Sequence, residues 1–240
     1  MKGLVIIPTY NEAENIRLII PEVLKQGRSF EVLVVDDNSP DGTGRIVKKM
    51  VQSNERIHLI ERKQKAGLGK AYVAGFKWAL KQDKSYDFFC EMDADFSHDP
   101  CELHLFTEAL KEGYDAVCGS RYIRGVRVLN WDLKRLLISL IGNIYARIST
   151  GVKLTDLTGG YNCYTRRVLE QLNLDGISSS GYSFQIEMKV KTTWKGFRIK
   201  EVPIIFRDRY EGTTKMSGGI VNEAILKCWK FRIDKWLKRI

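Results

Sequence analysis

Three acidic residues, Glu91, Asp93 and Asp95, stand at the end of the largely apolar segment 86–90. Burying unpaired carboxylates costs free energy, so we expect them at the open end of a buried strand, facing a ligand. Alternate side chains of an extended segment point the same way, so Asp93 and Asp95 can converge on one cation. Such oxygen ligands suit Mg²⁺ or Mn²⁺ carrying a phosphorylated substrate, although Asp-x-Asp alone also fits a solvated loop.

Polar residues also follow two earlier segments that look like buried strands. Tyr10 and Glu12 come directly after the first segment, where they can contact a nucleotide or simply begin a helix. Asp36 and Asp37 follow the second, where they can accept hydrogen bonds from a base or a ribose. The residues after Asp37 also favour an ordinary turn, so both interpretations stay open.

Basic residues accompany these acids. The loop 63–70 is basic and contains glycine, but it lacks the spacing of a Walker A or GxGxxG motif. Arg121 comes just past another strand, where a bound phosphate would suit it better than open water. Arg209 and Lys215 lie in a glycine-containing loop that could close over an anion or remain a basic surface loop.

The elements that position these residues alternate between strand and helix in the first half of the chain. This alternation predicts an α/β fold with a mostly parallel sheet and helices on both faces. We expect strands over residues 3–8, 31–35, 57–61, 86–92, 116–119 and 199–206, and helices over 11–25, 45–53, 69–82, 99–111, 131–149, 166–172 and 183–195. Ligands bind outside the carboxyl ends of parallel strands, so the motifs predict one shared site.

Two segments of the second half are apolar on one side and carry basic residues. These are 131–149 and the tail 220–240, which contains tryptophan. Basic amphipathic helices of this kind bind membrane interfaces, so we expect both to lie there. The alternative is that they pack on the core or on an oligomer partner.

The composition limits the class of protein. The net charge of +10 implies an anionic partner, namely nucleic acid, a phosphorylated substrate or a membrane surface. Nucleic acid is not favoured, because no nucleic-acid-binding motif is evident. The five cysteines contain no CxxC pair and indicate reduced thiols in a cytosolic protein. We expect neither a signal peptide nor a transmembrane helix, hence a soluble or peripheral protein.

Taken together, the motifs resemble those of a known family. The blocks IPTYNEAENI, VVDDNSPDGTG, MDADFSHDP, DLTGGYNCY, GYSFQIEM and EVPIIFRDRYEGTTKM occur in this order between residue 5 and about residue 216. They resemble the dolichyl/polyprenyl-phosphate mannose synthases of glycosyltransferase family 2. The resemblance implies a Rossmann-like GT-A catalytic domain over 1–219, including the helix 131–149, followed by a basic amphipathic helix over 220–240.

The resemblance also implies roles for individual residues. The guanosine part of the donor would contact Pro8, Tyr10, Glu12, Val35 and Asp37, and the donor diphosphate with a Mg²⁺ or Mn²⁺ ion would contact Asp93, Ala94 and Asp95. The acceptor phosphate would contact Arg121, Arg135 and Ser139. Arg209 and Lys215 would close on the donor. Asp93, Asp95 and Arg121 would be the catalytic residues. Some relatives carry Gln as an extra metal ligand where this chain has Ser97, so a third protein ligand stays open.

The implied reaction transfers mannose from GDP-mannose to a polyprenyl monophosphate, dolichyl or undecaprenyl, and inverts the anomeric centre. The acceptor phosphate is already largely dianionic at neutral pH, so we expect no general base and no histidine at a strand end. The implied location is the cytoplasmic face of a membrane, with a small membrane protein or a second copy as a possible partner. Alternatives are transfer from a UDP-sugar (glucose or GlcNAc) to undecaprenyl phosphate, a nucleotidyltransferase and a membrane-binding adaptor without activity.

Overall fold

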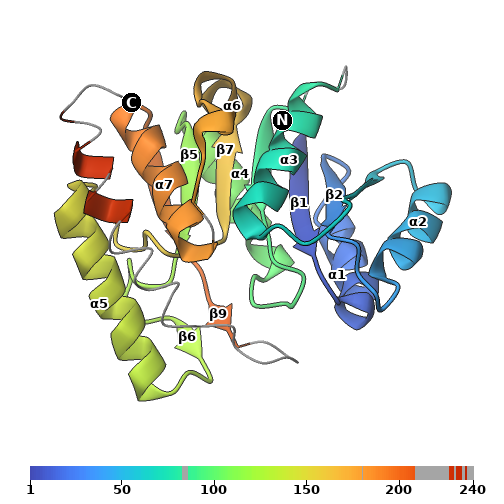
Figure 1. The fold of residues 1–240 in the computed structure, drawn as a ribbon, viewed down its shortest axis with the longest axis horizontal. Helices are drawn as coiled ribbons and strands as arrows, with labels where there is room; N and C mark the ends of the chain where they lie inside the picture. Colours follow the sequence, from blue (N-terminus) through green and yellow to red (C-terminus); the bar gives the residue numbers. More distant parts are fainter. Residues whose placement is uncertain (83–85, 180, 209–226, 230, 234–235, 237–240) are drawn as a thin grey trace.

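The computed structural model describes residues 1–82, 86–179, 181–208, 227–229, 231–233 and 236 (Figure 1). Its centre is one seven-stranded sheet in the order β3-β2-β1-β4-β7-β5-β8. The strands are β1 (Gly3–Thr9), β2 (Phe30–Asp36), β3 (Ile57–Glu61), β4 (Phe88–Glu91), β5 (Ala116–Ser120), β7 (Asn162–Thr165) and β8 (Ile199–Pro203). All neighbours pair in parallel except β7, which is antiparallel to both β4 and β5. The predicted mostly parallel α/β fold is confirmed.

Helices cover both faces of this sheet. The helices are α1 (Ala13–Lys25), α2 (Thr43–Ser53), α3 (Leu68–Leu80), α4 (Leu103–Lys111), α5 (Leu133–Thr150), α6 (Arg166–Gln171) and α7 (Gly181–Trp194), with short 3₁₀ turns at Pro100–Glu102 and Leu174–Gly176. One core cluster joins the sheet to α1, α2 and α4, and a second joins it to α3, α6 and α7. Val5 of β1 belongs to the first cluster and Leu4 to the second. Burial on both faces explains why β1 is an almost continuous apolar run.

Helix α5 lies beside this three-layer body rather than on the sheet (Figure 1). Its inner side joins a third cluster, in which Ala146 packs near Ile186 and Val190 of α7. Two residues of the tail, Cys228 and Phe231, are buried in the same cluster. The described tail residues 227–229, 231–233 and 236 are helical. The part of the predicted tail helix that the structure describes is therefore anchored on α5 and α7.

Two parts of the second half differ from the prediction. The predicted strand over 199–206 is interrupted after Pro203, and its end forms β9 (Phe206–Arg207), which pairs with β6 (Val128–Leu129) in a separate two-stranded sheet. Proline has no backbone N–H to continue a ladder, and Ile204 donates its N–H to the carbonyl of Ser120 as the chain leaves the sheet. Strand β7, in the block DLTGGYNCY, was not predicted. Within the described ranges, no helix is long and apolar enough to cross a membrane.

Candidate active site

A cleft of about 410 Å³ opens at the carboxyl ends of β1, β2 and β4. It brings together most of the predicted site residues: Pro8, Tyr10, Glu12, Asp37, Asp93, Ala94, Asp95, Ser97, Arg121 and Arg135. Val35 and Ser139 do not line it, since Val35 is buried in the core and Ser139 accepts a hydrogen bond from the Tyr122 hydroxyl at 2.7 Å. Arg209 and Lys215 lie outside the described residues.

The first end of the cleft is formed by the loops after β1 and β2. Asp36 is structural, because its carboxylate accepts hydrogen bonds from Thr9 Oγ1 at 2.9 Å and from the Ser39 hydroxyl at 2.6 Å. Asp37 instead lines the cleft and pairs with Arg62 at 3.1 Å. Burial raises the pKa of Asp37, although Arg62 partly opposes that effect.

The predicted basic loop contributes to this same end. Lys65 lines the cleft and places its ammonium 3.9 Å from the centre of the Tyr10 ring. The ring face attracts the cation, so Tyr10 and Lys65 hold each other at the rim. The backbone N–H of Ala66 donates to Asp37 at 3.2 Å and ties the loop to the strand end. An aromatic ring, a cation and a buried carboxylate together can bind a base, a ribose and a phosphate.

The middle of the cleft contains the Asp-x-Asp motif. Asp95 is buried and accepts the backbone N–H of Ser97 at 3.1 Å, while Asp93 is half-buried. The Ser97 hydroxyl is buried and has no hydrogen-bond partner in the described part of the chain. No group of three His, Cys, Asp or Glu side chains placed to hold a metal occurs among the described residues. Two carboxylates and an orphaned hydroxyl nevertheless fit a hard cation that also binds phosphate oxygens and water.

His98 also lines the cleft beside this motif, although it was not among the predicted site residues. The imidazole is 1% exposed, stacks on Tyr161 at 4.8 Å and accepts the backbone N–H of Asp93 on Nδ1 at 3.1 Å. Burial lowers the pKa of His98 to about 4, so the ring is neutral at physiological pH. Because His98 lines the cleft at the end of β4, the expectation of no histidine at a strand end was wrong. Its only signal was its place three residues after Asp95.

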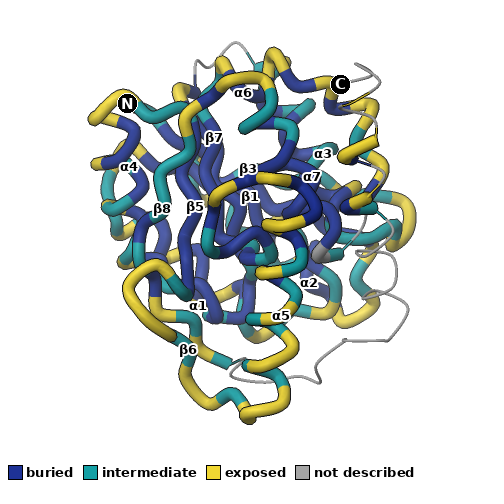
Figure 2. The backbone as a smooth tube through the Cα atoms, turned by 90° about the vertical axis from the view of Figure 1, so that its left-hand side faces the viewer, coloured by how far each residue is buried: buried dark blue, intermediate teal, exposed yellow. Residues whose placement is uncertain are grey.

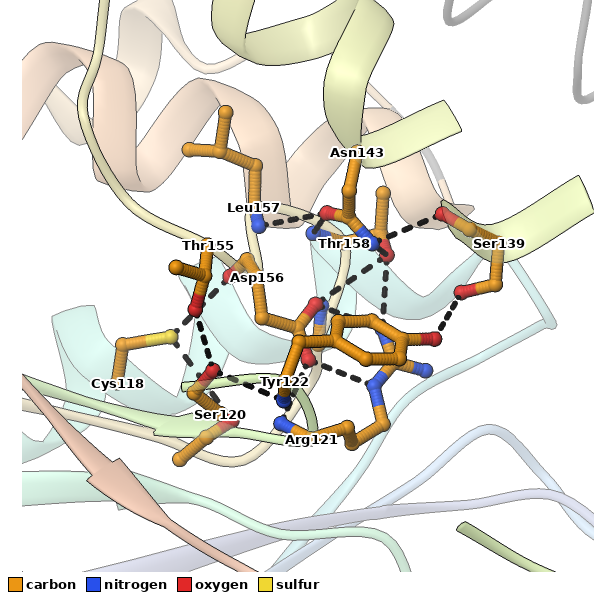
Figure 3. A network of polar contacts seen from close by, with 12 residues as sticks. Cys118, Ser120, Arg121, Tyr122, Ser139, Asn143, Thr155, Asp156, Leu157 and Thr158 are labelled. Carbon is orange, nitrogen blue, oxygen red and sulfur yellow. Dashed lines mark hydrogen bonds and ion pairs between the residues drawn. The ribbon is translucent and has the colours of Figure 1, made fainter. Parts of the chain in front are cut away.

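At the other end of the cleft, Arg121 is held by a buried carboxylate (Figure 3). Its Nε and Nη2 donate to the two carboxylate oxygens of Asp156 at 2.6 and 2.7 Å, and Nη2 also donates to Thr158 at 2.8 Å. Burial alone would raise the pKa of Asp156, but the charge and hydrogen bonds of Arg121 lower it to about 2. The guanidinium also lies 5.5 Å from the ring centres of Trp131 and Phe206. Arg121 is thus fixed in place before any substrate arrives.

The loop that supplies Asp156 is itself held by two buried polar side chains. Asn143 of α5 accepts the backbone N–H groups of Leu157 and Thr158 at 2.8 and 3.1 Å (Figure 3). Lys189 of α7 is buried and donates to three carbonyls of the loop, including that of Gly159 at 2.7 Å. The loop therefore links α5 and α7 to Arg121.

Arg135 lies at the start of α5, at the same end of the cleft. Asp132 caps this helix by accepting the Arg135 N–H at 2.7 Å. The guanidinium stacks 4.2 Å from the Trp131 ring centre and donates to Asp208 at 2.7 Å. Two arginines, Arg121 and Arg135, therefore stand where α5 meets the cleft.

From this end of the cleft, the outer side of α5 presents an apolar stripe. Its exposed residues are Leu133, Leu137, Ile138, Ile141, Ile144 and Ile148. Figure 2 shows exposed positions along α5 and along the adjoining loop that carries β6. Trp229, Ile233 and Trp236 of the tail are exposed as well. A run of exposed apolar residues this long is typical of a surface that contacts a membrane or another protein.

The described geometry defines an α/β enzyme of the GT-A kind, with acids at strand ends facing a cleft between a nucleotide-like end and a pair of arginines. The model of the family "Glycosyl transferase family 2" matches residues 4–172, so this chain belongs to glycosyl transferase family 2. The nucleotidyltransferase and the inactive adaptor are therefore not retained.

Curated relatives are similar over nearly the whole chain. The polyprenol monophosphomannose synthase of Mycolicibacterium smegmatis is 44% identical over 239 residues, which cover 99% of this chain and 89% of the relative. The undecaprenyl-phosphate mannosyltransferase of Micrococcus luteus is 45% identical over 226 residues, covering 94% and 92%. Among solved structures, glucosyl-3-phosphoglycerate synthase from Mycobacterium tuberculosis, in complex with Mn²⁺, UDP and glucosyl-3-phosphoglycerate, has a TM-score of 0.70 at 17% identity. That match covers 96% of this chain and 79% of the other, and it supports the fold.

Proposed function

We propose that this chain transfers mannose from GDP-mannose to a polyprenyl monophosphate at a membrane surface. The names of both curated relatives support mannose as the transferred sugar and a polyprenyl phosphate as the acceptor. The observation that carries the proposal is the order of groups along one cleft. Nucleotide-like contacts at Tyr10 and Asp37 lead through Asp93 and Asp95 to Arg121, close to the exposed apolar stripe of α5. A water-soluble donor and a lipid acceptor need those two ends.

In the proposed reaction an acceptor phosphate oxygen forms a bond to the anomeric carbon while the bond from that carbon to the donor phosphate breaks. GDP leaves with the electron pair, and the anomeric centre inverts. The acceptor oxygen is already ionised at neutral pH, so no protein base is needed. Arg121 and Arg135 would orient the acceptor phosphate, although Ser139 is occupied by Tyr122 and would reach it only by exchanging that hydrogen bond.

Asp93 and Asp95 would hold a Mg²⁺ or Mn²⁺ ion together with the donor diphosphate, and the orphaned Ser97 hydroxyl is the candidate third ligand. Bound there, the cation would neutralise charge that develops on the GDP leaving group. The protein's own part is to fix the two carboxylates, which it does for Asp95 through the Ser97 N–H.

A donor screen tests the proposal. Purified protein is supplied with a polyprenyl phosphate in detergent, with Mg²⁺ or Mn²⁺, and with GDP-mannose, UDP-glucose or UDP-GlcNAc. We expect glycolipid product from GDP-mannose at least tenfold faster than from either UDP-sugar. Product from a UDP-sugar alone would establish the alternative donor class, and no product from any of the three would refute sugar transfer to this acceptor.

The proposal also places α5 and the tail at the membrane, with residues 1–219 as the catalytic domain and 220–240 as an amphipathic helix. Truncation at 219 is a poor test, because Cys228 and Phe231 are buried against α5 and α7. A better test is Ile141→Asp, which puts a charge on the stripe at a side chain that is 64% exposed, with Leu18→Asp at a 61% exposed position of α1 as the matched control.

We expect full-length protein to co-sediment with vesicles containing anionic lipid, and Ile141→Asp to weaken that binding severalfold more than Leu18→Asp. The same measurement on Trp236→Glu reports on the tail. Equal binding by the two aspartate variants would mean that α5 does not contact the membrane. A protein partner or a second copy of the chain would then be favoured as the occupant of the apolar stripe.

A further inference from the structure

The order of strands in the sheet defines a middle part of the cleft, which lies between the nucleotide end and Arg121. Strands β4 and β7 lie between β1, which leads to the nucleotide end, and β5, which leads to Arg121. Because β7 is antiparallel, its first residue, Asn162, pairs with Glu91 at the end of β4. The residues just before β7, including Gly160, therefore reach the same edge of the sheet as Asp93.

His98 presents a hydrogen-bond donor to this middle part. Its Nδ1 accepts the backbone N–H of Asp93, and an amide N–H can only donate. The ring proton must therefore be on Nε2. Tyr161 stacks on one side of the ring, and Phe206 packs edge-on at 5.6 Å, so the imidazole cannot turn freely.

Gln185 of α7 presents a second donor to the same part. The side chain is 2% exposed and lines the cleft, and its Oε1 accepts from Asn162 Nδ2 at 2.8 Å. That bond sets the amide orientation and leaves Nε2 as the free end. Nε2 lies near Glu91, where the amide helps to oppose the burial that raises the pKa of that carboxyl to about 8. Among the described residues, it has no hydrogen-bond partner of good geometry.

Gly160 provides the space between these two donors. A Cβ atom at this position would lie 3.7 Å from Gln185 Nε2, 3.8 Å from His98 Nε2 and 3.4 Å from His98 Cε1. Both nitrogens are thus within 3.8 Å of one point that a side chain would fill. The φ angle of Gly160 is not in the left-handed region, so backbone strain does not explain the glycine.

We propose that His98, Gln185 and Gly160 form the subsite for the hydroxyl groups of the transferred sugar, with the two Nε2 atoms as donors and Gly160 leaving room for the ring. The inference rests on the proposed function, because a transferred group must sit between the donor nucleotide and the acceptor phosphate. Two donors held in fixed positions discriminate well against a sugar that lacks or misplaces the matching hydroxyl.

Three substitutions test the subsite. Gly160→Ala fills the space between the donors, and Gly142→Ala on α5, where a Cβ would meet nothing within 4 Å, is the matched control. His98→Asn keeps an acceptor for the Asp93 N–H but deletes the Nε2 donor. Gln185→Met keeps the length of the side chain but deletes the amide. Calorimetry measures the affinity of each variant for GDP and for GDP-mannose in the presence of Mn²⁺.

We expect each of the three variants to bind GDP within about twofold of the unsubstituted protein. Each should bind GDP-mannose about tenfold more weakly, as expected for the loss of one hydrogen bond or of the space for the ring. In turnover, KM for GDP-mannose should rise more than kcat falls.

Unchanged GDP-mannose affinity in Gly160→Ala and His98→Asn would overturn the subsite, and so would an equal loss of GDP affinity, which would mean a structural role. Gly160→Ala keeps the test decisive if the buried His98 variant does not fold. If the unsubstituted protein binds GDP but makes no product from GDP-mannose, the proposed function has failed instead.

Discussion

The buried pair of Arg121 and Asp156 predicts a large stability loss from a small change, Asp156→Asn. Asp156 is fully buried, and its carboxylate also accepts the Gly159 N–H at 2.9 Å. An asparagine there keeps the volume but has one acceptor oxygen where the carboxylate has two. Arg121 and Lys189, both buried, would then have lost the negative charge between them.

The structure allows the size of this loss to be worked out. A shift of the Asp156 pKa from 3.8 to about 2 corresponds to roughly 2 kcal/mol favouring the ionised, folded state at pH 7. Removing one partner of a buried ion pair typically costs about 3–5 kcal/mol, because the remaining charge is left unbalanced. We therefore expect Asp156→Asn to lower the free energy of unfolding by about 3 kcal/mol, a large part of the roughly 5–15 kcal/mol that folded domains have.

Urea unfolding at pH 7 measures the loss, with Asp175→Asn as the matched control. Asp175 also pairs with a cation, Lys77, but its side chain is 84% exposed, so its loss should cost less than about 1 kcal/mol. The depressed pKa also fixes a pH dependence. The contribution of Asp156 to stability is present above pH 3.8 and lost as the pH falls toward 2. The free energies of unfolding of the unsubstituted protein and of Asp156→Asn should therefore converge in acid. Equal losses in the two variants at pH 7 would refute the buried pair.

Burial alone would raise the pKa of Glu31, but hydrogen bonds from Lys2, Tyr86 and His58 lower it to about 2. Glu31→Gln should therefore lower the free energy of unfolding by about 1–3 kcal/mol at pH 7, and this loss should shrink as the pH falls from 4.5 toward 2. Thermal unfolding of both proteins at pH 7 and pH 3 measures the loss. An equal loss at the two pH values would contradict the reasoning. Asp95→Ala should lower the rate of sugar transfer by about 10²–10³-fold or more without changing the circular dichroism spectrum. EDTA should cause the same loss in the unsubstituted protein until Mn²⁺ or Mg²⁺ is restored. Near-normal turnover in the variant or in the EDTA-treated protein would rule out a metal ion held by Asp95.

The sequence was sufficient for the parallel half of the fold because parallel strands buried on both faces leave a plain signal. The runs that become β1 and β3 were bounded to within one residue of the structure. Strand β7 left no such signal, since it has only four residues and follows two glycines. Its antiparallel place between β4 and β5 depends on pairings with strands more than forty residues away.

Some residues of the site could be predicted from the sequence and others could not. Asp93, Asp95 and Tyr10 could be found because each follows a strand directly, and strand ends meet at one edge. The partner of Arg121 could not be found so, because Asp156 is 35 residues further along the chain and no local pattern marks an ion pair. His98 was missed for a related reason, since its neutral, buried state depends on Tyr161 and Phe206 from distant segments.

The position of Arg121 bears on how the acceptor end of the cleft would operate. An arginine already bound to Asp156 at both carboxylate oxygens loses part of its attraction for a lipid phosphate. It gains a fixed position, however, so less side-chain entropy is lost when the phosphate binds. Arg135 is held less tightly, because the side chain of its partner Asp208 is 31% exposed, whereas that of Asp156 is fully buried. We therefore expect Arg135 to supply more of the electrostatic attraction and Arg121 more of the alignment. In kinetic measurements, Arg135→Ala should chiefly raise KM for polyprenyl phosphate, whereas Arg121→Lys, which loses the two-point contact with Asp156, should chiefly lower kcat. The reverse pattern would mean that Asp156 releases Arg121 when the acceptor binds.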